Sequence, residues 1–258
     1  MVTLKNLYNT LIDKFSLNLQ AEWDQSGIRR FNPWDKKIDK VLLCLDCNEE
    51  VINLAIKFKY HVIISHHPIF VNSSEIENQC NTNLILNKLQ EHKISLISLH
   101  TCVDNNEYGL NFYLIKMLKL NNILCIKNPN IDALYYIGCF RKPLKFNNAI
   151  NFINKTFKTS SIKFLKKTNI IDSIILSCGS GFSILKSDLK NFSKNSLIIT
   201  GDIKWHEWIL LDDLKINAID VGHDLEKYFI DLINSILINK FSKLKITKHY
   251  PTIKLVSL

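Results

Sequence analysis

The fold class of this chain follows from the stretch His61-Val62-Ile63-Ile64-Ser65-His66-His67-Pro68. Three apolar residues in succession, without polar alternation, are typical of a strand buried on both faces of a parallel sheet. Pro68 cannot donate a hydrogen bond to a neighbouring strand, so the strand must end before it. The sequence therefore predicts two adjacent histidines, His66 and His67, at the carboxyl end of a buried strand, where ligand sites of parallel α/β sheets form.

Segments typical of strands and of helices alternate along the rest of the chain. This alternation predicts an α/β fold with mainly parallel or mixed sheets covered by helices. The predicted strands are Lys40–Leu45, His61–Ser65, Ile94–Leu99, Leu134–Phe140, Asp172–Ser177, Ser196–Thr200 and Ile216–Val221. The predicted helices are Leu4–Phe15, Glu49–Phe58, Asn81–His92, Leu110–Leu118, Asn147–Phe157, Ile184–Asn191, Trp205–Leu211 and Glu226–Ile238.

The best candidate for a domain boundary is the Asn-rich stretch Asn121–Asn130, which ends in Asn128-Pro129-Asn130. It divides the chain into two α/β segments, residues 1–125 and residues 126–258. We expect the C-terminal part of the second segment to return to the predicted site at His66 and His67 in the first segment.

Composition excludes several classes of protein. No apolar run in the 258 residues approaches the ~18 residues that a transmembrane helix needs. The formal net charge is +9, but only three of the 33 basic residues are arginine, the residue that recognises phosphates and bases in bidentate geometry. A dedicated nucleic-acid surface is therefore not expected. Seven irregularly spaced cysteines, including the pair Cys44 and Cys47, are typical of buried, reduced thiols in a cytoplasmic protein.

Two further predicted strands end in metal-ligand residues. His100 and Asp104 follow the strand Ile94–Leu99, and His223 and Glu226 follow the strand Ile216–Val221. Each pair alone also fits a structural role, because Asp224 and Glu226 could simply stabilise the start of a helix. Together with the histidine pair they form a mixed nitrogen and oxygen ligand set. That set suits Zn, Fe, Mn, Co or Ni better than Ca.

Two loops could serve a substrate. Ser177–Ser183 contains two glycines after a strand, so its backbone amides could hold an anion, although a tight turn explains the same residues. Thr200–Glu207 supplies Asp202, Lys204 and His206 after another strand.

Six motifs occur in an order that resembles the dinuclear-metal-centre hexameric protein family, often labelled GTP cyclohydrolase 1 type 2. They are Trp23–Gly27, Ile64–Pro68, His100–Asp104, Ser177–Gly181, Thr200–Lys204 and Val221–His223. The resemblance, to the short bacterial form, implies two linked α/β domains, a cytoplasmic homohexamer and two divalent metal ions per subunit. The implied metal ligands are His66, His67, Asp104, His223 and Glu226, with His100 beside them.

The sequence departs from the family pattern at two places. Two residues separate His223 from Glu226 where the family usually has three, so Asp224 is an alternative ligand. Cys102 stands where asparagine is common, which predicts a soft donor near the metals.

The function that the resemblance implies is hydrolysis of a nucleotide by a metal-activated hydroxide, which in a cyclohydrolase attacks C8 of guanine. His100 or His206 would move the proton, and Ser177–Ser183 with Lys204 would hold the triphosphate. Two alternatives remain open: a metal-dependent phosphoesterase, and a non-catalytic hexamer that stores or delivers metal or acts as a scaffold.

Overall fold

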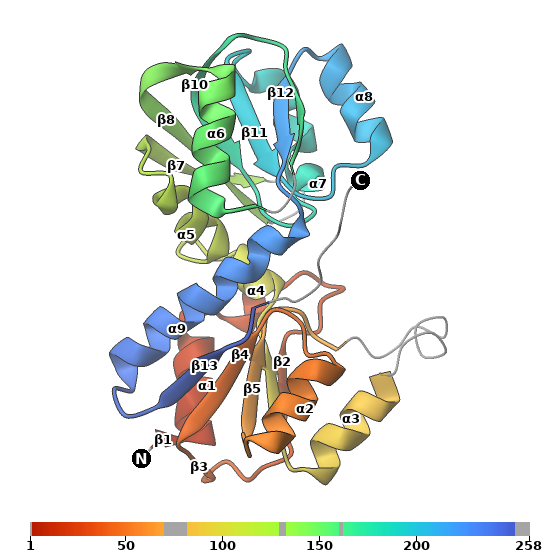
Figure 1. Cartoon of the computed structure of the whole chain (residues 1–258), viewed down its shortest axis with the longest axis vertical. Coiled ribbons are helices and arrows are strands. Elements are labelled where there is room, and N and C mark those ends of the chain that lie inside the picture. The colour runs from red at the N-terminus through yellow and green to blue at the C-terminus, as the bar shows by residue number, and fades with distance from the viewer. Residues whose placement is uncertain (1, 70–81, 129–132, 160–161, 251–258) are drawn as a thin grey trace. The chain divides into compact units, whose positions relative to one another are not determined.

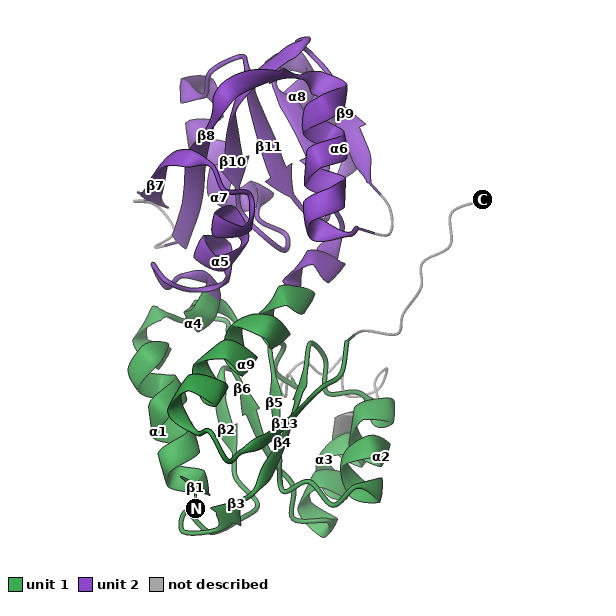
Figure 2. Cartoon of the chain, turned by 60° about the vertical axis from the view of Figure 1, so that its left-hand side comes forward, with its two compact units in different colours: residues 1–103, 227–254 green, residues 104–226, 255–258 purple. Residues whose placement is uncertain are grey.

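The computed structural model describes residues 2–69, 82–128, 133–159 and 162–250 (Figure 1). Contacts divide the chain into two compact units, residues 1–103 with 227–254 and residues 104–226 (Figure 2). Both units are α/β, as the sequence predicts. Their bounds differ from the segments 1–125 and 126–258, because residues after Glu226 pack with the first unit.

The first unit contains a five-stranded sheet with the order β13-β4-β5-β6-β2. All neighbours are parallel except β2, which runs antiparallel to β6. The strands are β2 (Gly27–Arg29), β4 (Lys40–Cys44), β5 (Val62–Ser65), β6 (Ser95–Ser98) and β13 (Lys245–Lys248), with a separate ribbon of β1 (Val2–Thr3) and β3 (Lys37–Ile38). Strands β5 and β6 are wholly buried, which explains their unbroken apolar pattern.

Helices α1 and α9 cover one side of this sheet, and α2 and α3 cover the other (Figures 1 and 2). The helices of this unit are α1 (Leu4–Lys14), α2 (Glu49–Lys57), α3 (Thr82–Glu91) and α9 (Tyr228–Lys240), with the short helix η1 (Leu17–Leu19). Helix α1 buries Leu4, Leu7 and Leu11, residues spaced three and four apart on one face. Asn48 begins α2 by accepting a hydrogen bond from the amide of Val51 at 3.0 Å.

The second unit contains a six-stranded mixed sheet with the order β7-β8-β10-β11-β12-β9. Its strands are β7 (Asn121–Asn128), β8 (Ala133–Lys145), β9 (Lys163–Leu165), β10 (Ile170–Leu176), β11 (Ser196–Thr200) and β12 (Asn217–Asp220). Its helices are α5 (Leu110–Met117), α6 (Phe146–Phe157), α7 (Phe182–Leu185) and α8 (Trp205–Asp213), with the short helix η2 (Lys186–Asn191). Strands β10, β11 and β12 are parallel, so their carboxyl ends share one edge.

The stretch that the sequence offers as a domain boundary, Asn121–Asn130, contains a strand that the sequence does not predict, because residues 121–128 form β7. Within the described part of the chain, this strand lies at the edge of its sheet and pairs with β8 alone. Most of its residues are exposed or half-buried, so it lacks the apolar pattern by which buried strands are found. The last two residues of the stretch lie outside the described residues.

Two short helices, α4 (Thr101–Asp104) and η3 (His223–Lys227), carry the chain between the units. The chain leaves the first unit between Val103 and Asp104 and returns between Glu226 and Lys227. In the part of the chain that the structure describes, no helix has the length and apolarity needed to span a membrane.

Candidate metal centre

Three histidines gather at the carboxyl edge of the first sheet. Hydrogen bonds extend the pairing of β4 with β5 beyond the strand ends, because the amides of His66 and His67 both donate to the carbonyl of Leu45, at 3.1 and 3.0 Å. His100 follows β6 at the same edge, and its ring centroid is 5.1 Å from that of His66 and 5.2 Å from that of His67. Each of the three offers a ring nitrogen within 4.8 Å of the others. The structure thus joins two of the predicted ligands with His100.

Fixed acceptors hold the Nδ1 atoms of the histidine pair. His66 is fully buried, and its Nδ1 lies 2.9 Å from the carbonyl oxygen of Leu99. Since a carbonyl only accepts, Nδ1 of His66 carries the hydrogen and Nε2 keeps its lone pair. Nδ1 of His67 lies 2.7 Å from Oδ1 of Asp46. This arrangement is typical of metal-binding histidines, whose second nitrogen donates to a carbonyl or carboxylate.

Asp24 holds the third histidine. Its Oδ1 lies 3.0 Å from Nδ1 of His100, and its Oδ2 accepts from the amide of Thr101 at 3.0 Å and the hydroxyl of Ser26 at 2.8 Å. Burial would raise the pKa of Asp24, but hydrogen bonds from His100, Thr101 and Ser26 outweigh it and hold this pKa well below its ordinary value. Asp24 therefore stays ionised and orients His100.

In the second unit, His223 lies between two carboxylates. Its Nδ1 is 2.5 Å from Oδ2 of Asp202, and its Nε2 is 3.0 Å from Oε2 of Glu226. The hydrogen bond to Glu226 is the main reason that the pKa of His223 is raised to about 9, and Asp202 adds to it. The three groups therefore attract positive charge, and a metal ion would compete for this place with the imidazole proton.

Glu226, rather than Asp224, is the buried acid of this segment, with 3% of its surface exposed. Gly179 makes room for it: a Cβ at Gly179 would lie 2.1 Å from Oε1 of Glu226, and the φ of Gly179 is +57°. Only glycine adopts that backbone readily, so the Ser177–Ser183 turn is shaped to admit a carboxylate. Glu226 and Asp202 make the surroundings of this turn acidic, and the expectation that it holds a phosphate stays a prediction.

Asp104, the remaining predicted ligand, is anchored in the second unit. The side-chain Nδ2 of Asn111 donates to the backbone carbonyl of Asp104 at 3.3 Å, and Sγ of Cys178 lies 3.8 Å from Oδ1 of Asp104. Burial, with the charges of Asp104 and Glu226, raises the pKa of Cys178 well above its ordinary value. Cys178 thus lies beside a predicted ligand, and the soft donor expected at Cys102 stays a prediction.

The other polar residues that the sequence singled out lie elsewhere. His206 is an exposed residue of α8, and it belongs to none of the metal-ligand groups found among the described residues. Lys204 is exposed, and its backbone amide donates to Glu207 at the start of α8. Cys44 and Cys47 are buried core thiols, and burial raises the pKa of Cys47 to about 12.

Sequence reasoning missed the contacts between the histidines and the acids that hold them, which are Asp24, Asp46 and Asp202. Asp24 stands 76 residues from the histidine it contacts, and Asp46 and Asp202 stand 21 residues from theirs. Spacing along the chain therefore carries no signal for these pairs. Their positions within quoted motifs were the one available indication, for Asp24 in Trp23–Gly27 and Asp202 in Thr200–Lys204.

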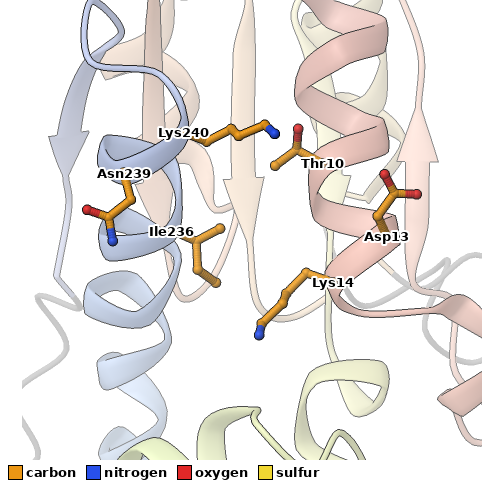
Figure 3. Close-up of a pocket in the computed structure, with 6 residues that line it drawn as sticks. All are labelled: Thr10, Asp13, Lys14, Ile236, Asn239 and Lys240. Atoms are coloured by element: carbon orange, nitrogen blue, oxygen red, sulfur yellow. The ribbon is translucent and has the colours of Figure 1, made fainter.

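A cavity of about 470 Å³ lies between α1 and α9 of the first unit, away from the histidines. Its lining residues are Thr10, Asp13, Lys14, Ile236, Asn239 and Lys240 (Figure 3). Lys14 and Lys240 occupy the last turns of their helices, where a positive charge offsets the helix dipole. These lysines thus have a structural role that needs no ligand.

Comparison with known proteins identifies the family. A sequence profile described as Duf34/NIF3 (NGG1p interacting factor 3) matches residues 2–252. A Ureaplasma parvum protein named GTP cyclohydrolase 1 type 2 homolog is 31% identical over 244 residues, 90% of this chain and 88% of that protein. A Clostridium perfringens protein of the same name is 29% identical over 225 residues, 85% of each chain. The crystal structure of Staphylococcus aureus hypothetical protein SA1388 shares the fold, with a TM-score of 0.85 and 23% identity over 98% of this chain and 99% of that one. The chain therefore belongs to the DUF34/NIF3 family, which confirms the resemblance seen in its motifs.

Proposed function

We propose that this protein binds two divalent metal ions per subunit and hydrolyses a nucleotide in the manner of a GTP cyclohydrolase 1 type 2. One observation carries the proposal: His66, His67 and His223 each have Nδ1 within hydrogen-bond distance of a carbonyl or carboxylate oxygen. The Nε2 atoms of these residues are thereby prepared as ligands. We propose a nucleotide as the substrate because the relatives are named GTP cyclohydrolase 1 type 2 homolog.

The proposed metal ligands are His66, His67, Asp104, His223 and Glu226. Imidazole and carboxylate donors fit Zn, Fe, Mn, Co or Ni, and a carboxylate can bridge two cations. Asp104 and Glu226 are the residues at which the chain enters and leaves the second unit. Each of these carboxylates also has a histidine within four residues along the chain, His100 before Asp104 and His223 before Glu226.

When bound, the metal pair would supply Lewis acidity that makes water a nucleophile at neutral pH. His100 is the residue that moves the proton. Since Asp24 keeps a hydrogen on Nδ1 of His100, the atom that accepts and returns the proton is Nε2. His100 is preferred to His206 for this role, because it lies with His66 and His67.

The test uses metal-loaded protein with two substrates, GTP and bis-p-nitrophenyl phosphate. We expect formate from GTP and no nitrophenol from the diester. His100→Gln should lower kcat by about 10²- to 10⁴-fold, the range of general acid–base catalysis, with metal content unchanged. His206→Gln is the matched control and should behave like the wild type. Nitrophenol without formate would instead indicate a phosphoesterase, and no product from either substrate would indicate a metal-binding protein without turnover.

We also propose the cytoplasmic homohexamer that the resemblance implies. Native mass spectrometry should give six times the 30.0 kDa chain mass. A monomer or dimer at micromolar concentration would contradict it.

A further inference from the structure

Trp23 exposes its side chain beside the histidine cluster. It is 63% exposed, whereas the next residue, Asp24, is 8% exposed. The indole contacts His100 nearly edge-on, with ring centroids 5.5 Å apart and planes at 72°. Most of this large apolar side chain therefore faces solvent beside the histidine cluster, where its ring face is available to a ligand.

The backbone that carries Trp23 is tied down on both sides. The amide of Asp24 donates to the carbonyl of Ala21 at 2.9 Å, which closes a turn around Trp23. The amide of Ala21 in turn donates to Oγ1 of Thr101 at 2.9 Å, and Oδ2 of Asp24 accepts from the amide of Thr101 at 3.0 Å. The turn is thus held against the first residue of α4, so the indole is presented from a rigid support. Little ordering entropy would remain to be lost when a ligand binds.

We propose that Trp23 is the stacking surface for a planar heteroaromatic ring of the substrate, a purine base, and so contributes to the affinity for it. This proposal rests on the proposed function, since it assigns the base of that nucleotide to one residue. A ring stacked parallel to the indole would lie at the same 72° to the plane of the His100 imidazole. Every base has a π-face, so stacking supplies affinity without hydrogen-bond readout.

The test is calorimetric binding of guanosine and of inorganic triphosphate to metal-loaded Trp23→Ala, Trp23→Phe and wild type. Trp23→Ala should weaken guanosine binding by about 10- to 100-fold, the range of one lost stacking contact. Trp23→Phe should retain most of the affinity, and triphosphate binding should not change. Trp205→Ala is the matched control, because Trp205 is 79% exposed on α8 in the other unit. Circular dichroism and metal content should be the same in all variants.

Equal guanosine affinity in Trp23→Ala and wild type would overturn the proposal, as would absence of guanosine binding by the wild type. Formate release distinguishes this failure from failure of the proposed function. If the wild type releases formate from GTP and Trp23→Ala does so with unchanged KM, the stacking role is wrong while the function stands. If guanosine binding depends on Trp23 but formate never forms, the stacking role stands while the hydrolysis is wrong.

Discussion

Asp24 shows at the level of single residues how this site is built. Its side chain contacts His100, Thr101 and Ser26, which joins two segments that are more than 70 residues apart. The sequence predicts the histidine but not the acid that orients it, because hydrophobic period and ligand spacing describe only local neighbours. Pairs such as His67 with Asp46 arise only when strands come together.

Asp24→Asn should lower the free energy of unfolding by about 2–4 kcal/mol at pH 7, since it removes a buried charge from its hydrogen-bonded partners. The lowered pKa means that ionised Asp24 stabilises the fold above the ordinary pKa of aspartate, and that this stability is lost as pH falls through the folded-state pKa. The difference from wild type should therefore shrink below about pH 4 in urea titrations. Asp35→Asn, at an exposed position, is the control and should change little. A pH-independent difference would contradict this account.

Gly179→Ala should both destabilise the protein and reduce its metal content. A methyl group there collides with Glu226 and stands on a backbone with φ +57°, so a loss of about 1–3 kcal/mol is expected. Thermal unfolding and elemental analysis check the two effects. Gly109→Ala is the control, because Gly109 has an ordinary φ of −87° at the start of α5. Full metal content in Gly179→Ala would show that the position of Glu226 does not matter.

At the level of helices and strands, the sequence predicts the buried elements well and the edges poorly. The two-sided burial of β5 and β6 produces the apolar runs by which they are recognised. Strands β2, β9 and β13 are not predicted, because their apolar pattern is too short to recognise. Each has only three or four residues, lies at a sheet edge and is partly exposed. Strand β7 is missed for the same reason of exposure.

Asn48→Ala tests whether stability and metal binding are separate properties of these elements. Loss of the cap of α2 should lower the free energy of unfolding by about 1 kcal/mol, because the amide of Val51 loses its acceptor. Metal content should stay at the wild-type value, since α2 carries none of the proposed ligands. Asn48→Asp keeps the acceptor and should restore the stability. Loss of metal in Asn48→Ala would mean that the helix also determines the site.

For the whole molecule, the residues that we propose as metal ligands are distributed over the two compact units. His66 and His67 belong to the first unit, and Asp104, His223 and Glu226 belong to the second. A linear reading of the sequence finds these residues because each follows a strand. It does not find the unit bounds, because α9 and β13 return to the first unit from the far end of the chain.

The central claim is that these five residues bind two metal ions, and elemental analysis of purified protein tests it most directly. The account predicts two divalent ions per chain in the wild type, a clear loss in Glu226→Gln, and no loss in Asp224→Asn. Equal metal content in all three proteins, or none in the wild type after loading, would contradict it.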